Sequence, residues 1–416
     1  MRAAGSAICD APLLRAPRQS RPASGTAQGD GDALMESPIT NPEKQRVWER
    51  YYAGQPERVP VALRTNDRVY MLDGRFNRDG LTYQDVFTDA RAMLTAQLNW
   101  QYVLYTHFHR YCDQPVGLPE RWQVSAFLHN TYEAWALGCP LRLEPGQVPD
   151  TVPGYTGDRK WAVFDVDIEH PLQLPSFRRA IELTEQMMEL ARGMEFHGRP
   201  VEVLPYLQTA SDGALTVALN VRGGEFLADL VEDPDYADRL LAFITQAAIN
   251  RVRALLAYWG KELQGELWLA DDSIVTISTA MYRERILPHH RHFYEALDPQ
   301  RKLKCVFHLC GNAARFFPII VEECGVLSID TGFPVDLAWL RRAVGPEVEI
   351  YGGVEVGLLL KGTPQQVRAR TRQVLESGVT AGGRFVLSEA NNLPPGVPEE
   401  NLAAMYQAAL EFGQLG

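Results

Sequence analysis

The chain has 416 residues, a formal net charge of -11 and a hydrophobic fraction of 46%, so its length allows one large domain or two ordinary ones. The acidic balance argues against a nucleic-acid partner, because phosphate binding needs a concentrated excess of Lys and Arg. The longest apolar runs are strand-length, which argues against a membrane-spanning helix and predicts a soluble protein. Six cysteines without a CxxC pair are too few for a disulfide scaffold and predict reduced thiols in a cytoplasm.

The N-terminal segment differs from the rest of the chain in composition, because it is rich in Arg, Ala, Gly, Ser and Pro. It contains no apolar stretch of the kind that marks a secretory signal, and Asp10, Asp30 and Asp32 weaken a transit-peptide interpretation. We expect residues 1–36 to be a disordered tail, or residues 1–34 to precede a true start at Met35. Residues 37–416 are then expected to form one folded domain.

The main part of the chain alternates short β-branched runs with longer amphipathic stretches, which is the pattern of strands followed by helices. Strands are predicted at 58–64, 122–127, 201–208, 265–272, 304–311, 326–332, 349–356 and 384–390. Helices are predicted at 234–259, 279–297, 312–325, 335–345, 363–378 and 398–412. Two of these helices carry clear end signals: Gly325 closes one, and Thr363 followed by Pro364 opens another.

Strand–helix alternation predicts parallel strands joined by right-handed crossovers. The central strands are nearly continuous apolar runs, as expected when both faces of a sheet are covered. Eight such strands close a barrel, so the predicted fold class is α/β, a (β/α)8 TIM barrel. Residues 65–120 and 139–200 are predicted to be N-terminal and lid elaborations over its mouth. An open doubly wound sheet is the competing fold, but no G-x-G-x-x-G motif follows a predicted strand.

Polar residues lie at or just beyond the ends of several predicted strands, where barrel enzymes build their active sites. They are Arg64, Asp271, Asp272, His308, Cys310, Asn312, Asp330, Glu389 and Asn391. His308 and Cys310 are two positions apart on one strand, so both side chains point to the same side. An imidazole and a thiolate suit zinc, with Glu389, Asn391 or another acidic residue as the third ligand. The alternative is a His that binds substrate beside a small buried Cys.

Two further sets of polar residues are candidate functional groups. Asp271 and Asp272 place one carboxylate inward, as a general acid or base or a site for a cationic group, or else they cap the following helix. His289, His290 and His292 fall within a predicted helix and are expected to be solvated.

Several longer stretches resemble the uroporphyrinogen decarboxylase superfamily. The first is HLCGN at 308–312, and the others are 133–149, 223–244, 270–278, 328–345, 351–367 and 393–405. The resemblance covers most of the chain after about residue 40, in the same order. It implies a (β/α)8 barrel, in agreement with the strand count.

Two motifs separate the branches of that superfamily. Decarboxylases of uroporphyrinogen carry RQAGRY after the first strand, where this chain has RTNDRVY and keeps only Arg64 and Arg68. They also carry FSDIL, whose Asp holds the pyrroles, where this chain has FLHNT and places His129 at that position. An imidazole does not accept several pyrrole N–H bonds as a carboxylate does, so the resemblance favours the methyltransferase-like branch.

Methyltransferases of this kind hold zinc with a His-x-Cys pair and a Cys near the last strand. His308 and Cys310 match the pair, whereas Asn391 stands at the position of the last Cys. The resemblance therefore implies methyl transfer between a small methylated substrate and a corrinoid or folate carrier, with any corrinoid on a separate protein. His308 and Cys310 would bind the metal, and Asp272, Asp330 and His308 would act in catalysis.

The remaining candidates, Arg64, Arg68, His129, Asn312, Glu389 and Asn391, are predicted to contact substrate. Two other functions stay open: a cofactor-free decarboxylase of uroporphyrinogen or another polycarboxylate, and a non-catalytic ligand-binding barrel. The resemblance also implies a homodimer. No nucleic-acid or membrane partner is expected.

Overall fold

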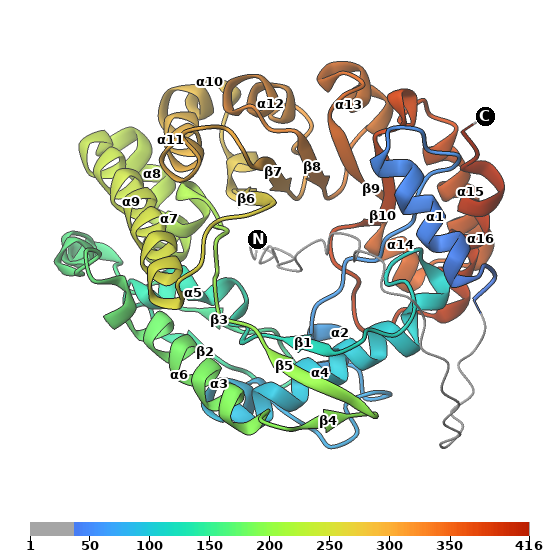
Figure 1. Cartoon of the computed structure of the whole chain (residues 1–416). Coiled ribbons are helices and arrows are strands. Elements are labelled where there is room, and N and C mark those ends of the chain that lie inside the picture. Colours follow the sequence, from blue (N-terminus) through green and yellow to red (C-terminus); the bar gives the residue numbers. More distant parts are fainter. Residues whose placement is uncertain (1–36, 416) are drawn as a thin grey trace.

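The computed structural model describes residues 37–415, so the predicted tail at 1–36 lies outside the described residues. The chain is an α/β protein whose elements follow one another around a ring (Figure 1). Strands β6 to β10 line the inner side of one part of the ring, and helices cover them on the outside (Figure 1). The five cysteines that the structure describes are free thiols, as predicted.

The central element is a five-stranded sheet with the order β10-β9-β8-β7-β6. Every neighbouring pair in it is parallel, which confirms the parallel strands predicted for the second half of the chain. Its strands are β6 (Glu266–Ala270), β7 (Lys304–Leu309), β8 (Ser328–Thr331), β9 (Glu349–Glu355) and β10 (Phe385–Ala390). The strands outside this sheet are β1 (Trp122–Val124), β2 (Leu141–Arg142), β3 (Asp150–Thr151), β4 (Glu195–Phe196) and β5 (Arg199–Val203).

Isolated parallel bridges extend the sheet at both of its edges. Val61 pairs with Leu387 of β10, and Ser211 pairs with Leu269 of β6. The predicted strand at 58–64 is reduced to such bridges, and Pro60 within it has no N–H to offer a ladder. β5 pairs with β1 and ends two residues before Pro205 for the same reason. The predicted eight-stranded ladder is thus present as a five-stranded sheet with single bridges beyond each edge, and as the separate parallel pair of β1 and β5.

The helices follow the predicted pattern most closely in the second half of the chain. They are α1 (Asn41–Tyr52), α2 (Arg68–Met71), α3 (Tyr83–Thr88), α4 (Ala90–Thr106), α5 (Tyr132–Ala136), α6 (Pro175–Leu190), α7 (Ala214–Arg222), α8 (Glu225–Glu232), α9 (Pro234–Trp259), α10 (Thr279–Met281), α11 (Leu287–Leu297), α12 (Phe317–Cys324), α13 (Leu337–Val344), α14 (Val356–Lys361), α15 (Pro364–Leu375) and α16 (Glu399–Phe412). Thr363 caps α15 in a capping box, and Gly325 ends α12 with a φ of 69°, as predicted.

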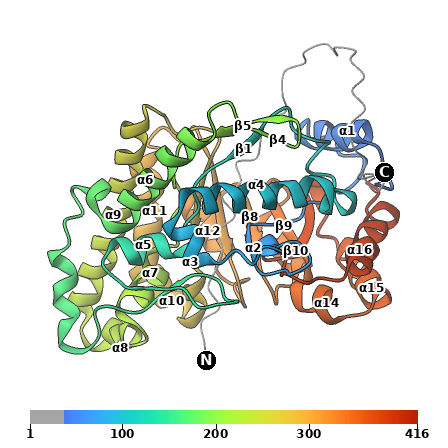
Figure 2. The same ribbon diagram turned by 90° about the horizontal axis from the view of Figure 1, so that it is seen from below.

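The prediction of a helix at 279–297 is confirmed, whereas one prediction about the N-terminal half is wrong in part. Residues 279–297 are helical throughout as α10, a π-helical turn at Tyr282–Ile286, and α11, and the turn lies just before Pro288, which has no N–H to donate. The regions predicted to be elaborations also supply part of the wall. In them, α4 and α6 pack against each other and against β1 and β5, on the side of the ring away from β7 and β8 (Figures 1 and 2).

The longest helix, α9, is apolar enough to cross a membrane by length and composition alone. Half of its most apolar window is buried in the chain, where it packs against α7, α8 and α11. Its Arg251 is fully buried and lies 3.1 Å from Glu133. This burial is the pattern of a core helix, in which the apolar face belongs to the interior of the fold.

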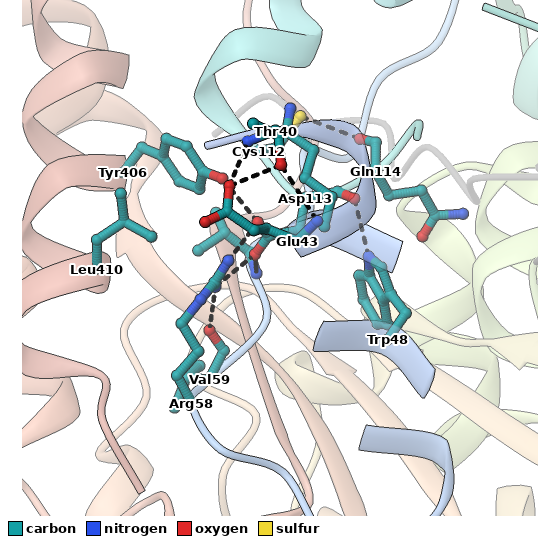
Figure 3. A network of polar contacts seen from close by, with 12 residues as sticks. Thr40, Glu43, Trp48, Arg58, Val59, Cys112, Asp113, Gln114, Tyr406 and Leu410 are labelled. Carbon is teal, nitrogen blue, oxygen red and sulfur yellow. Dashed lines mark hydrogen bonds and ion pairs between the residues drawn. The ribbon is translucent and has the colours of Figure 1, made fainter. Parts of the chain in front are cut away.

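A buried carboxylate ties the N-terminal helix, the first predicted strand and the last helix together (Figure 3). Asp113 accepts two hydrogen bonds from the Arg58 guanidinium, both 2.7 Å long, and one of 2.8 Å from the Val61 N–H. The Tyr406 hydroxyl donates a further bond of 2.6 Å, and the Trp48 indole donates to the backbone oxygen of Asp113. The Asp113 side chain is fully buried, so its charge depends on these partners.

Asp113→Asn is expected to destabilise the protein by about 3 kcal/mol or more, because it leaves the Arg58 guanidinium buried without a counter-charge. Asp150→Asn is the matched control, since Asp150 pairs with Arg142 and both side chains are about half exposed. Its cost is expected to be no more than about 1 kcal/mol. Thermal and urea unfolding of both variants checks the difference, and equal losses would contradict it.

Candidate active site

The ends of three neighbouring strands bring the main candidate residues together. Ala270 of β6 is in register with His308 of β7, and His308 is in register with Asp330 of β8. Because the strands are parallel, the residues just after these positions meet at one edge of the sheet. Asp272 and Cys310 both lie two positions beyond the β6–β7 pair, so both belong to this edge.

The His308 imidazole lies between a carboxylate and a thiol. Its Nδ1 is 2.9 Å from Asp330 Oδ2, and its Nε2 is 3.1 Å from Cys310 Sγ. A carboxylate that is ionised only accepts hydrogen bonds, so Nδ1 carries a proton and Nε2 faces the sulfur. The prediction that the side chains of His308 and Cys310 share one side of the strand agrees with this contact.

Asp272 completes a group of three donor atoms. Its Oδ1 accepts a hydrogen bond of 2.6 Å from the Cys310 N–H and lies 3.8 Å from His308 Nε2. The donor atoms of Asp272, His308 and Cys310 all lie within 4.8 Å of one another. We call these three residues the donor group. The sequence spacing predicts His308 and Cys310 as metal ligands, whereas it predicts Asp272 as a catalytic residue.

Electrostatic contacts around the donor group fix its ionisation. Burial alone would raise the pKa of Asp330, but the nearby Arg64 guanidinium and His308 outweigh burial and hold that pKa below its usual value. Burial alone would lower the pKa of His308, but Cys310, Asp330 and Asp272 outweigh it and hold that pKa well above its usual value. The site therefore favours an ionised Asp330 carboxylate beside a protonated His308 ring, whose Nε2 proton a bound metal would displace.

Arg64 lies behind Asp330, with its Nη2 3.0 Å from Asp330 Oδ2. Its guanidinium stacks between aromatic rings, 4.5 Å from the Tyr351 centroid and 5.2 Å from the Trp268 centroid. The Arg64 N–H also donates a 2.6 Å bond to Glu389 Oε1. Glu389 is fully buried, and burial raises its pKa well above the usual value. The charge of Arg64, predicted to bind a substrate anion, is thus paired within the protein.

The other predicted substrate contacts lie outside the donor group. Arg68 opens α2, and its N–H donates to the side chain of Asn66. His129 is buried, with its Nε2 3.1 Å from Asp67 Oδ1. The histidine at the position of the decarboxylase FSDIL aspartate therefore has a carboxylate beside it. Asn312 is exposed, and Asn391 adopts a φ of 110° and accepts a bond from the Asn392 amide.

Sequence reasoning missed a second buried group beside the site. Asp271 faces away from the donor group and accepts bonds from the N–H groups of Leu215 and Thr216 at the start of α7. His290 Nε2 lies 3.0 Å from Asp271 Oδ2. The prediction that His290 is solvated is wrong, because its side chain is 1% exposed. Local helical spacing contains no signal for a partner on a distant strand.

Comparison with known proteins gives one family and several relatives. The model of the family described as Uroporphyrinogen decarboxylase (URO-D) matches residues 123–412. A methylated-thiol–coenzyme M methyltransferase of Methanosarcina mazei is 29% identical over 287 residues, which are 67% of this chain and 70% of the relative. A methylcobamide:CoM methyltransferase of the same organism is 23% identical over 202 residues, 48% of this chain and 56% of the relative.

A uroporphyrinogen decarboxylase of Pelobacter propionicus is 27% identical over 176 residues, 42% of this chain and 48% of the relative. The chain therefore aligns with only about half the length of this relative and of the second methyltransferase. Among solved structures, a methyltransferase from Methanosarcina mazei superposes with a TM-score of 0.61 at 18% identity, over 89% of this chain and 98% of the other. That likeness concerns the fold.

Gly332, just after β8, leaves no room for a side chain beside Cys310. A Cβ at this position would lie 2.7 Å from Cys310 Cα and 3.2 Å from Cys310 Sγ. Gly332→Ala is therefore expected to destabilise the protein by about 1–3 kcal/mol through overpacking. Gly357→Ala is the control, because a Cβ there meets nothing within 4 Å, and its effect should be neutral or stabilising by up to about 1 kcal/mol. Thermal unfolding of both variants tests this prediction. Similar midpoint temperatures would contradict the lack of space between Gly332 and Cys310.

Proposed function

The chain belongs to the uroporphyrinogen decarboxylase family, and we propose that within this family it is a methyltransferase. The observation that carries the proposal is the donor group, in which a thiol, an imidazole and a carboxylate lie within 4.8 Å of one another. The likeness to two methyltransferases supports it. The reaction would move a methyl group between a small methylated substrate and a corrinoid or folate carrier, with a corrinoid supplied by a separate protein.

The donor group fits a zinc ion in its chemistry. Sulfur, nitrogen and oxygen donors are the ligands that zinc takes in proteins, and three protein ligands leave one position for a substrate. Cys310 and Asp272 each bring one negative charge, so Asp272 keeps the formal charge that a second cysteine would bring to such a site. Asn391, which stands at the family's cysteine position, brings none. Zinc held there would lower the pKa of a bound substrate thiol and make it nucleophilic.

The neighbouring residues orient the donors. Asp330 accepts the Nδ1 proton of His308 and so directs Nε2 to the donor group, as carboxylates behind metal-bound histidines do. Arg64 pairs with Asp330 and keeps that carboxylate ionised. The Cys310 N–H holds one oxygen of Asp272. We assign Arg68 and His129 to substrate contacts, and Glu389 to the support of the first predicted strand through the bond that it accepts from the Arg64 N–H.

The proposal also includes the finer features of the fold and setting. Residues 37–416 would form one barrel of eight strands, which the single bridges beyond both sheet edges support. The enzyme would be cytoplasmic, in line with the free thiols among the described residues, and homodimeric, as the family resemblance implies.

Decarboxylation of uroporphyrinogen or another polycarboxylate is the second candidate, because decarboxylases also resemble the chain and Arg64 and Arg68 keep their spacing. Against it, the charge of Arg64 is already paired with Asp330. In its favour, Asp67 places a carboxylate beside His129, the residue at the position of the decarboxylase aspartate. A substrate assay separates the two candidates.

Metal analysis of the purified protein tests the proposal. We expect about one zinc per chain, since the donor group forms one site. The double variant His308→Ala with Cys310→Ala is expected to lose the metal, and Asp272→Ala to weaken its binding about tenfold or more. Cys305→Ala is the matched control, because Cys305 is a buried thiol on the same strand outside the donor group, and it should keep the zinc.

Activity is then measured with methylcobalamin and a small thiol, and separately with uroporphyrinogen. Zinc-dependent methylation of the thiol that is lost in the double variant supports the proposal. A metal-free protein that releases carbon dioxide from uroporphyrinogen would replace it with the second candidate.

A further inference from the structure

The carboxylate of Asp272 has a buried support that is distinct from the donor group. Asp271 and Asp272 follow β6 directly and point to different places: Asp272 to Cys310, and Asp271 to the N-terminus of α7. Asp271 is fully buried, and its two oxygens accept four hydrogen bonds from α7 and α11. These bonds come from Leu215 N, Thr216 N, Thr216 Oγ1 and His290 Nε2, with lengths of 3.0, 2.8, 2.7 and 3.0 Å.

The Thr216 hydroxyl bonds to the turn after β6 both as a donor and as an acceptor. It donates to Asp271 Oδ1 at 2.7 Å and accepts a bond of 3.0 Å from the Ser273 N–H. One side chain of α7 therefore holds the residue before Asp272 and the residue after it. A backbone held on both sides has little freedom to rotate, so the direction of the Asp272 side chain is set from α7.

The start of α7 is itself fixed from the other side. Ser211 Oγ and the Asp212 N–H both donate to Glu133, which pairs with the buried Arg251 of α9. Gly213 passes so close to the end of β6 that a Cβ there would lie 2.1 Å from the Ala270 oxygen. Its φ of 85° also favours glycine. The N-terminus of α7 is thus a rigid support against which the turn after β6 is held.

We propose that the contact between Thr216 and the 271–273 turn is a positioning device that keeps Asp272 in the donor group. Asp271 and Thr216 lie outside the donor group and act through Asp272. Loss of the Thr216 hydroxyl therefore changes how tightly the donor group binds a metal more than it changes the fold. The inference rests on the proposed function for its metal readout, and it has a second, metal-free readout in the mobility of the turn.

Thr216→Val removes both hydrogen bonds of the hydroxyl and keeps the shape of the side chain. Thr216→Ser restores the hydroxyl and serves as the rescue variant. Thr371→Val is the matched control, because Thr371 is a fully buried helical threonine whose hydroxyl bonds only within α15. All three are compared with the wild-type chain as full-length protein, with thermal unfolding recorded for each.

Two measurements test the device. Amide hydrogen exchange of the peptide covering residues 270–275 is expected to speed up about tenfold or more in Thr216→Val only, because the Ser273 N–H loses its acceptor. Zinc affinity of the metal-free protein, measured by competition with a chromophoric chelator, is expected to fall about 10- to 100-fold in the same variant. Thr216→Ser and Thr371→Val should stay close to wild type in both, even where Thr371→Val lowers the unfolding temperature.

The outcomes separate the two proposals. Unchanged exchange in Thr216→Val would overturn the positioning device. Faster exchange with unchanged zinc affinity would overturn its link to the donor group. Faster exchange in a protein whose wild type binds no zinc would leave the device in place as a support for Asp272 and would overturn the metal part of the proposed function.

Discussion

The contact between His308 Nδ1 and the Asp330 carboxylate decides what the site can do. An imidazole has two nitrogens with different roles, and a carboxylate partner at one of them settles the role of the other. With Nδ1 held at 2.9 Å from Asp330, Nε2 faces Cys310 and Asp272. The ion pair between Asp330 and Arg64 keeps that carboxylate ionised although it is almost completely buried. Arg64 ends the first predicted strand, so this strand also helps to orient His308.

The register of the parallel strands brings His308 and Asp330 side by side and places the other site residues next to them. His308 and Asp330 are paired positions on neighbouring parallel strands, and Ala270 is the partner of His308 on the other side. A shift of one residue in either pairing would turn one set of side chains to the other face of the sheet. The buried network around Asp113, at the junction of α1, the first predicted strand and α16, contributes stability to the same ring without touching the donor group.

Sequence reasoning found what local rules determine. The two-residue period of a strand placed His308 beside Cys310, and the helix caps at Thr363 and Gly325 followed from residue type. It did not find the third donor, because Asp271 and Asp272 look alike in the sequence. The N-terminus of α7 distinguishes them, because Asp271 accepts hydrogen bonds from it, whereas Asp272 accepts one from the Cys310 N–H. His290 was misjudged for the same reason, since its partner Asp271 lies on another element.

The most direct measurement is a crystal structure of the zinc-loaded protein with anomalous diffraction recorded at the zinc edge. We predict one strong anomalous peak in contact with His308 Nε2, Cys310 Sγ and a carboxylate oxygen of Asp272, with Asp330 still bonded to His308 Nδ1. A peak elsewhere in the chain, or a metal held by His308 and Cys310 with Asp272 turned away from it, would contradict this prediction.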